Sequence, residues 1–177
     1  MRLRLLDGSR VFIDLKASGV LRALAHSPTL TARPERVVVE LDEAAGRGPI
    51  DLGVEATFAV KSIEAPADIS AGDRDKMLEN LRGREVLDAG RSPTVEFQGR
   101  YAGTLDGGTL AGDVRVRGAA HRVSIPVTVT RDEAGFVARG AWEGRLTDLG
   151  VKPFRALLGA IKLEDWIRLR LEVHLGR

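Results

Sequence analysis

Three histidines, His26, His121 and His174, are the side chains best suited to acid–base or metal chemistry. No two of them stand two or four residues apart, the spacings that place ligands side by side on a strand or a helix, so the sequence predicts no metal site. The chain has no cysteine, which excludes disulfides, thiolate nucleophiles and cysteine–metal centres. Gly-x-Ser-x-Gly and glycine-rich phosphate-loop motifs are also absent from the sequence. We therefore expect no catalytic residues, no cofactor and no enzymatic activity.

Length and charge narrow the class of protein further. A chain of 177 residues is expected to form one domain over residues 1–177 and to bury about 70% of its unfolded surface. The net charge is +2 and the basic residues are spread along the chain, which argues against a nucleic-acid partner. No run approaches the ~18 apolar residues of a membrane helix, and charges interrupt the N-terminal segment. We expect no transmembrane segment. We also expect a cytoplasmic protein, although a removed leader would leave the same pattern. The sequence leaves open whether the protein forms a homodimer.

Most of the chain alternates apolar and polar residues with a period of two, as strands with one buried and one solvated face do. Glycine-containing turns such as "LDGGT" at 105–109 separate these segments. The expected strands are residues 10–17, 36–43, 51–60, 93–101, 109–118, 121–130, 135–144 and 165–175. About eight strands joined mostly by short turns predict a mostly β, antiparallel fold that closes into a barrel or packs as a sandwich.

Three segments have helical spacing instead: "SGVLRALAH" at 18–26, "AGDRDKMLENLRG" at 71–83 and "KPFRALLGAI" at 152–161. In the second segment we expect Asp73 as the N-cap and Gly83 at the end. Its apolar stripe includes Leu78 and Leu81, which we expect to be buried against the strands as a lid.

Aligned by their apolar faces, the strands share one interior, because a period of two fixes which residues point inward. Glycine and alanine on these faces predict unfilled volume, unless the helices or large neighbouring side chains fill it or the glycines mark bulges or tight bends. An eight-stranded barrel can just hold its own side chains or one small ligand. The candidate ligand-binding residues are Phe58, Phe97, Gly99, Tyr101, Leu110, Val114, Val127, Phe136, Gly140 and Trp142.

The order of several segments resembles the YceI-like, polyisoprenoid-binding family. "RDKMLENLRGREVLDAGRSPTVEF" is similar to the family's charged helix, its short "L-D" segment and its "P-T-x-x-F" strand. "SGVLRALAH", "LAGDVRVRGAAHRVSIPVTV" and the C-terminal "RLTDLGVKPFRALLGAIKLEDWIRLRLEVHL" resemble further family segments in the same order. The resemblance covers nearly the whole chain.

The resemblance implies a lipocalin-like barrel that holds an isoprenoid or another lipid chain in its interior. We therefore expect non-enzymatic binding and carriage of an amphiphilic lipid, such as a polyisoprenoid or a prenylated quinone. Two alternatives stay open at this point. One is an enzyme that uses the barrel pocket on a small hydrophobic substrate, and the other is an interaction module with a filled barrel.

Overall fold

The computed structural model describes residues 2–18, 27–40, 49–156 and 161–176. Its strands are β1 (Arg2–Leu5), β2 (Arg10–Ser18), β3 (Thr29–Ala32), β4 (Arg36–Glu40), β5 (Ile50–Ala59), β6 (Thr94–Gly103), β7 (Gly107–Val116), β8 (Ala119–Arg131), β9 (Phe136–Gly144), β10 (Arg155–Ala156) and β11 (Ile161–Gly176). The helical elements are the 3₁₀ turns η1 (Val60–Ser62) and η2 (Leu146–Leu149) and one α-helix, α1 (Ala71–Arg82). All eight strands expected from the sequence are present, as β2, β4 to β9 and β11.

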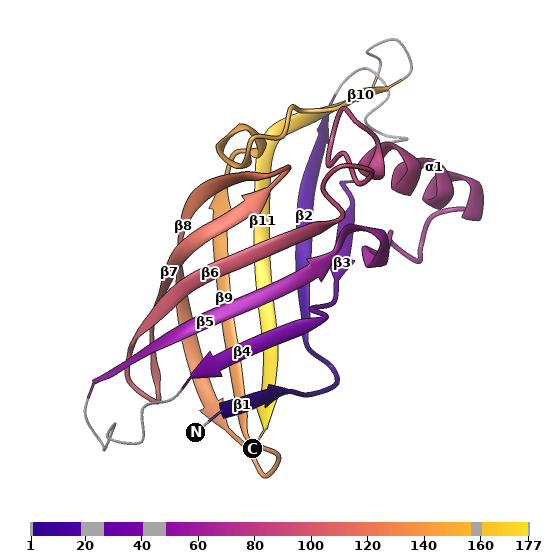
Figure 1. Ribbon diagram of the computed structural model, residues 1–177. Helices are drawn as coiled ribbons and strands as arrows, with labels where there is room; N and C mark the ends of the chain where they lie inside the picture. The colour runs from indigo at the N-terminus through magenta and orange to yellow at the C-terminus, as the bar shows by residue number, and fades with distance from the viewer. Residues whose placement is uncertain (1, 19–26, 41–48, 157–160, 177) are drawn as a thin grey trace.

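The wall of the closed antiparallel barrel consists of eight strands, β1, β4 to β9 and β11, and β2 pairs with the same edge of β11 as β1 (Figure 1). From β5 to β9 each strand pairs with the next one along the chain, and β9 pairs with β11, which pairs with β2. The short N-terminal β1 closes the wall by pairing with β4 on one side and with β11 on the other. Arg4 lies opposite Gly176 in this closure, so the two ends of the chain complete the barrel together.

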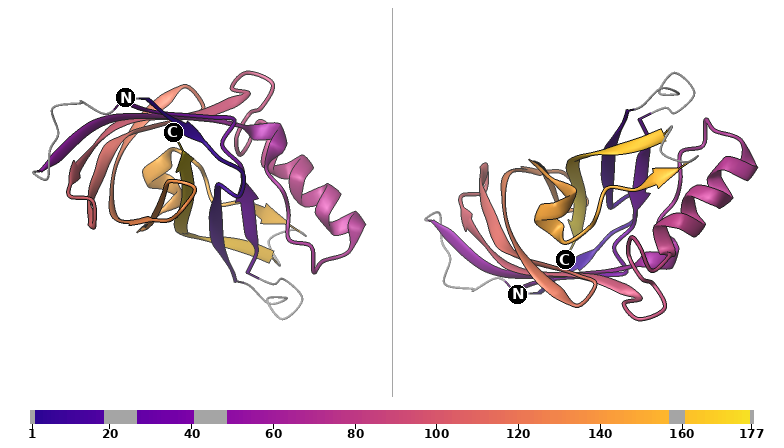
Figure 2. Two further views of the ribbon diagram at one scale, coloured as in Figure 1. Left: turned by 90° about the horizontal axis from the view of Figure 1, so that it is seen from below. Right: turned by 90° about the horizontal axis from the view of Figure 1, so that it is seen from above.

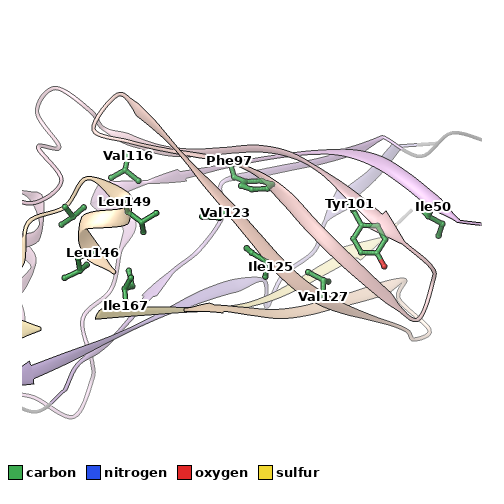
Figure 3. Close-up of a cluster of buried hydrophobic side chains, with 11 residues drawn as sticks. Ile50, Phe97, Tyr101, Val116, Val123, Ile125, Val127, Leu146, Leu149 and Ile167 are labelled. Carbon is green, nitrogen blue, oxygen red and sulfur yellow. The ribbon is translucent and has the colours of Figure 1, made fainter. Parts of the chain in front are cut away.

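The alternation seen in the sequence becomes an apolar interior and a polar exterior. In β8, Val123, Ile125 and Val127 are buried, whereas Arg122 and Thr128 are exposed. The largest cluster of buried side chains joins β5, β6, β7, β8, β11 and η2 (Figure 3). Its fully buried members are Ile50, Phe97, Tyr101, Val116, Val123, Ile125, Val127, Leu146, Leu149, Val151 and Ile167. The expected period-two register is therefore correct for these strands.

The helix α1 begins earlier than expected and does not form the lid. Its N-cap is Ser70, whose hydroxyl oxygen accepts a hydrogen bond from the Asp73 backbone N–H at 3.1 Å, so Asp73 lies in the first turn. The helix ends at Arg82 with Gly83 as its cap, as expected. No residue of α1 is fully buried, and Leu78 and Leu81 are half-buried. The expectation that both leucines are buried is wrong, because α1 lies beside the β3 side of the wall and not across its opening (Figure 2).

The other two expected helices have different outcomes. Residues 19–26 of the first lie outside the described residues. For the third segment, residues 152–161, the prediction of a helix is wrong in the described part. Arg155 and Ala156 form β10, and Ile161 begins β11. Arg155 pairs with Lys162 and Ala156 with Ile161, so backbone pairing with β11 overrides the expected helix at these residues, while residues 157–160 lie outside the described residues.

None of the helices in the described residues is both long enough and apolar enough to cross a membrane.

Candidate functional site

The interior of the barrel brings together the ten candidate residues from the sequence, although they belong to three side-chain clusters. Most of them lie in or against the largest cluster: Phe97, Tyr101 and Val127 are buried there, and Leu110, Val114 and Trp142 pack on it while staying half-buried. Phe136 packs against a second cluster of Leu3, Val37, Val39 and Leu175, where β1 closes the wall. Phe58 packs against a third cluster of Leu30, Ala32 and Ile63, beside α1. Gly99 and Gly140 continue the inner faces of β6 and β9.

Many inward-facing side chains keep accessible surface although the wall is closed. On β11, Leu169, Leu171 and Val173 are half-buried, and on β5 the same holds for Val54 and Ala56. These residues alternate in phase with buried neighbours, so their remaining exposed surface faces the interior of the barrel. A barrel packed solid with side chains would bury them, since protein cores leave few voids larger than a water molecule. The burial pattern therefore indicates an interior that its own side chains do not fill.

The glycines of the inner faces do not produce this unfilled space directly. A Cβ atom placed on Gly99 or Gly112, which lie opposite each other, would come within 2.6 or 2.9 Å of the Phe97 ring. In the same way the Trp142 ring covers Gly144, with ring carbons 2.4 and 2.5 Å from the position of a Cβ atom there. Each aromatic ring thus lies along the wall over the glycine two residues later. At Gly99 the space is thus filled by a large neighbouring side chain, the Phe97 ring.

Gly140 is required by close approach of the backbone. A Cβ atom on it would lie 2.6 Å from the carbonyl oxygen of Pro126 and 3.1 Å from side-chain carbons of Ile125 and Val127. Any side chain at this position would therefore push against backbone. Ala138, two residues earlier on the same face of β9, is the better place to add volume to the interior, since it is half-buried against the largest cluster.

One end of the barrel is covered by η2 and the residues that follow it. Leu146, Leu149 and Val151 are buried against Val116, Val123 and Ile167, and η2 lies within the outline of the wall (Figures 2 and 3). Gly150 ends η2 in the left-handed conformation, with φ of 69°, which turns the chain back toward the wall. The sequence reasoning did not find this cover, although Gly150 directly after Leu149 is a helix-ending signal that could have indicated it.

Two carboxylates hold η2 in place. The Asp165 carboxylate accepts hydrogen bonds from the Thr147 backbone N–H at 2.9 Å and from its hydroxyl at 2.6 Å. These bonds lower the pKa of Asp165 below its ordinary value. Asp148 accepts a bond from the Arg145 backbone N–H at 2.9 Å, which lowers the pKa of Asp148. Asp148 is exposed and Asp165 is half-buried, so the buried leucines of η2 supply most of its attachment.

Three titratable side chains are in phase with the inner faces of β6 and β8: Tyr101, His121 and Arg131, which is exposed at the end of β8 over the Phe136 ring. The Tyr101 hydroxyl donates a hydrogen bond of 2.6 Å to the carbonyl oxygen of Thr104, and burial raises its pKa. Tyr101 lies near the end of the barrel opposite η2 (Figure 3), whereas His121 lies beside η2 and contacts Gly150. The two side chains are therefore too far apart to act as one acid–base pair.

A charged network covers the outer face of β2, β9 and β11. Arg170 donates two hydrogen bonds to Asp14, of 2.6 and 2.8 Å, and this bonding holds the pKa of the Asp14 carboxyl below its ordinary value. Glu172 accepts bonds from Arg139 at 2.9 Å and from the His174 ring at 3.1 Å. A groove of about 490 Å³ on this face is lined by Phe12, Pro126, Arg139 and Ala141 among others. Among the described residues no group of three or more His, Asp or Glu side chains has the geometry of a metal site.

Taken together, the fold and the site define a small closed β-barrel with a covered end and an apolar interior whose wall side chains keep some accessible surface. The YceI-like domain profile matches residues 13–175, and the chain belongs to the YceI-like family. The resemblance read from the sequence is therefore confirmed. No curated protein matches the chain.

Solved structures agree with this fold. Burkholderia cenocepacia BcnA is 15% identical, with a TM-score of 0.68 over 96% of each chain. A Campylobacter jejuni YCEI protein is 12% identical, with a TM-score of 0.55 over 82% of this chain and 84% of that one. A mutant of the latter protein was crystallised with a monobromobimane guest; it too is 12% identical, with a TM-score of 0.56 over the same shares of the two chains. At such identities the likeness concerns the fold.

Proposed function

We propose that this protein binds and carries an amphiphilic lipid, such as a polyisoprenoid or a prenylated quinone, inside the barrel without transforming it. The observation that carries the proposal is the ring of inward-facing, half-buried aliphatic side chains in a closed wall. Such a surface suits an apolar chain, because burying each methylene group contributes about 0.8 kcal/mol. Membership of the YceI-like family supports the same class of ligand.

The site's polar groups favour binding over catalysis. Tyr101 and His121 lie toward opposite ends of the interior, and the larger set of charged groups lies on the outer face, where Arg170 and Glu172 bond to neighbouring side chains. A general acid or base must lie within hydrogen-bond reach of the substrate atom that it serves, so side chains at opposite ends of the interior do not act together on one reacting centre. The filled-barrel alternative is disfavoured by the half-buried inner faces of β5 and β11.

The substitution Ala138→Phe tests the proposal by adding a ring to the interior. We expect it to weaken binding of a prenyl alcohol by about ten-fold or more, since displacing two methylene groups of ligand costs about 1.6 kcal/mol. The measurement is isothermal titration calorimetry, which should also give a negative heat-capacity change for the unsubstituted protein.

Ala102→Phe is the matched control, because Ala102 is exposed on the outer face of β6. It should leave the affinity unchanged, and thermal unfolding followed by circular dichroism should show that both variants are folded. Equal affinity in Ala138→Phe and Ala102→Phe would place the ligand outside the barrel. Native mass spectrometry of the freshly purified protein would identify a lipid that co-purifies with it.

A further inference from the structure

His121 is a polar side chain within an apolar inner face. It lies on β8 in phase with Val123, Ile125 and Val127, which are buried, and it pairs with Val114 of β7. The side chains that surround this end of the interior, Val116, Leu149 and Val151, are aliphatic. The other titratable side chains in phase with the inner faces of β6 and β8 are Tyr101, whose hydroxyl is already bonded, and Arg131, which is exposed at the end of β8 over the Phe136 ring.

The His121 ring has an unpaired nitrogen. Its Nε2 atom is buried and has no hydrogen-bond partner among the described residues. The backbone of η2 covers this edge of the ring: a Cβ atom on Gly150 would lie 2.9 Å from Cε1 and 3.0 Å from Nε2. A buried polar atom without a partner costs about 1–3 kcal/mol, and most such atoms in proteins are bonded. The described residues therefore leave this nitrogen without a hydrogen bond, and a ligand in the barrel can supply one.

Several charged groups around this end are already bonded to their neighbours. Arg145 bonds to Asp148, and Arg122 lies 3.6 Å from Asp113. Asp165 accepts its two hydrogen bonds from Thr147. On the adjacent turn, Arg115 and Arg117 donate to the carbonyl oxygens of Gly118 and Arg84. These cations are thus engaged elsewhere, which favours a neutral partner for His121 over an anion.

We propose that His121 recognises the polar end of the ligand, and that this end carries a hydroxyl or carbonyl oxygen. The inference rests on the proposed function, because it assumes a lipid in the barrel. A neutral imidazole has one donor and one acceptor, so it can serve either oxygen. The apolar chain then runs from His121 toward the end at Tyr101. A rotation of the ring, or a small displacement of residues 146–151, brings the ring nitrogen to the interior.

Three probes of equal chain length test this recognition: farnesol, which ends in a hydroxyl; farnesene, which has no oxygen; and farnesyl phosphate, which ends in an anion. We expect the protein to bind farnesol about three- to ten-fold more tightly than farnesene, because farnesol gains one hydrogen bond. His121→Phe should remove this preference. His121→Gln, which keeps a donor and an acceptor, should retain part of it. Calorimetry gives all these affinities.

The outcomes separate the two proposals. If farnesol and farnesene bind equally well, or if His121→Phe keeps the preference for farnesol, His121 does not recognise the ligand and the carrier function stands. If farnesyl phosphate binds more tightly than farnesol and His121→Phe removes that difference, the neutral head group is wrong. If none of the three probes binds, the carrier function and the role of His121 fail together.

A measurement on the unsubstituted protein covers the case in which His121→Phe does not fold. With ¹⁵N-labelled histidine, the ring signals of the three histidines can be followed by NMR, and the signal missing from folded His121→Gln belongs to His121. Farnesol should shift the His121 ring nitrogens more than farnesene does. Identical spectra with the two probes would overturn the proposal.

Discussion

Asp14 and Arg170 form the best-bonded ion pair of the outer face. Besides the two bonds from Arg170, Asp14 accepts a hydrogen bond of 2.7 Å from the Thr29 hydroxyl, so the pair ties β11, β2 and β3 together. The Arg170 guanidinium also lies over the Phe12 ring, 4.9 Å from its centre. The Asp14 side chain is 20% exposed, which weakens screening by solvent.

We expect Asp14→Asn to destabilise the fold by about 1–3 kcal/mol at pH 7, the range for hydrogen bonds to charged groups. Because bonding to Arg170 lowers the folded-state pKa of Asp14 below 3.8, the stabilisation is present above that ordinary value and is lost as the pH falls through the lowered pKa. Urea unfolding of both proteins between pH 7 and pH 2 measures this, and the difference between them should shrink at the acid end.

The control for Asp14 is Asp51→Asn, which breaks an ion pair with Arg100 whose side chains are 64% and 65% exposed. Such a pair contributes at most about 1 kcal/mol. An equal loss of stability in the two variants would show that the Asp14 network adds nothing beyond an ordinary surface pair.

At the scale of elements, two short helical segments differ in what they bury. The 3₁₀ turn η2 places Leu146 and Leu149 in the core, 6% exposed each, although it has four residues. The longer α1 buries none of its residues and touches the wall through half-buried Met77 and Leu81. Leu78 lines a surface hollow of about 460 Å³ with Asp75, Glu79, Arg82 and Gly83. The cover of the barrel is therefore η2.

Truncation of one leucine in each segment should show this difference. Leu149→Ala should destabilise the protein by about 2–5 kcal/mol, because it leaves a cavity in the largest cluster. Leu78→Ala should cost less than about 1 kcal/mol, since its side chain is half in solvent. Urea unfolding gives both values. If Leu78→Ala were the more damaging change, α1 and not η2 would be the structural cover.

For the whole molecule, the decisive contact joins the two ends of the chain. β1 has four residues, yet it pairs with β4 and β11 and places Leu3 in a buried cluster with Val39 and Leu175. Without this strand, β4 and the last residues of β11 would present unpaired edges, which is unfavourable for a β-protein. The termini accordingly lie side by side at the end of the barrel away from η2 (Figure 1).

We expect Leu3→Ala to destabilise the whole barrel by about 2–5 kcal/mol, because Leu3 is 6% exposed at the closure. The control is Leu105→Ala on the β6–β7 turn, where the side chain is 56% exposed and the expected change is within about 0.5 kcal/mol. Thermal and urea unfolding measure both. A loss at Leu3 no greater than that at Leu105 would show that the barrel is stable without closure by β1.

The sequence by itself determined the long strands and their inner faces. Alternation with a period of two is a local property, so the orientation of Val114, Val127 and Trp142 could be predicted without knowing their neighbours. The family resemblance was equally accessible, because it depends on the order of segments along the chain.

Tertiary structure alone decided the closure, the cover and the state of the interior. The four residues of β1 are too few for a periodic signal, and their partners lie about 40 and 170 positions away. The leucines of η2 and α1 have similar local patterns, and packing settles which are buried. Whether Gly99 leaves a space depends on where the Phe97 ring lies, which follows from packing across three strands. Likewise, the absence of a hydrogen-bond partner for His121 among the described residues becomes evident only when β8 and η2 are brought together.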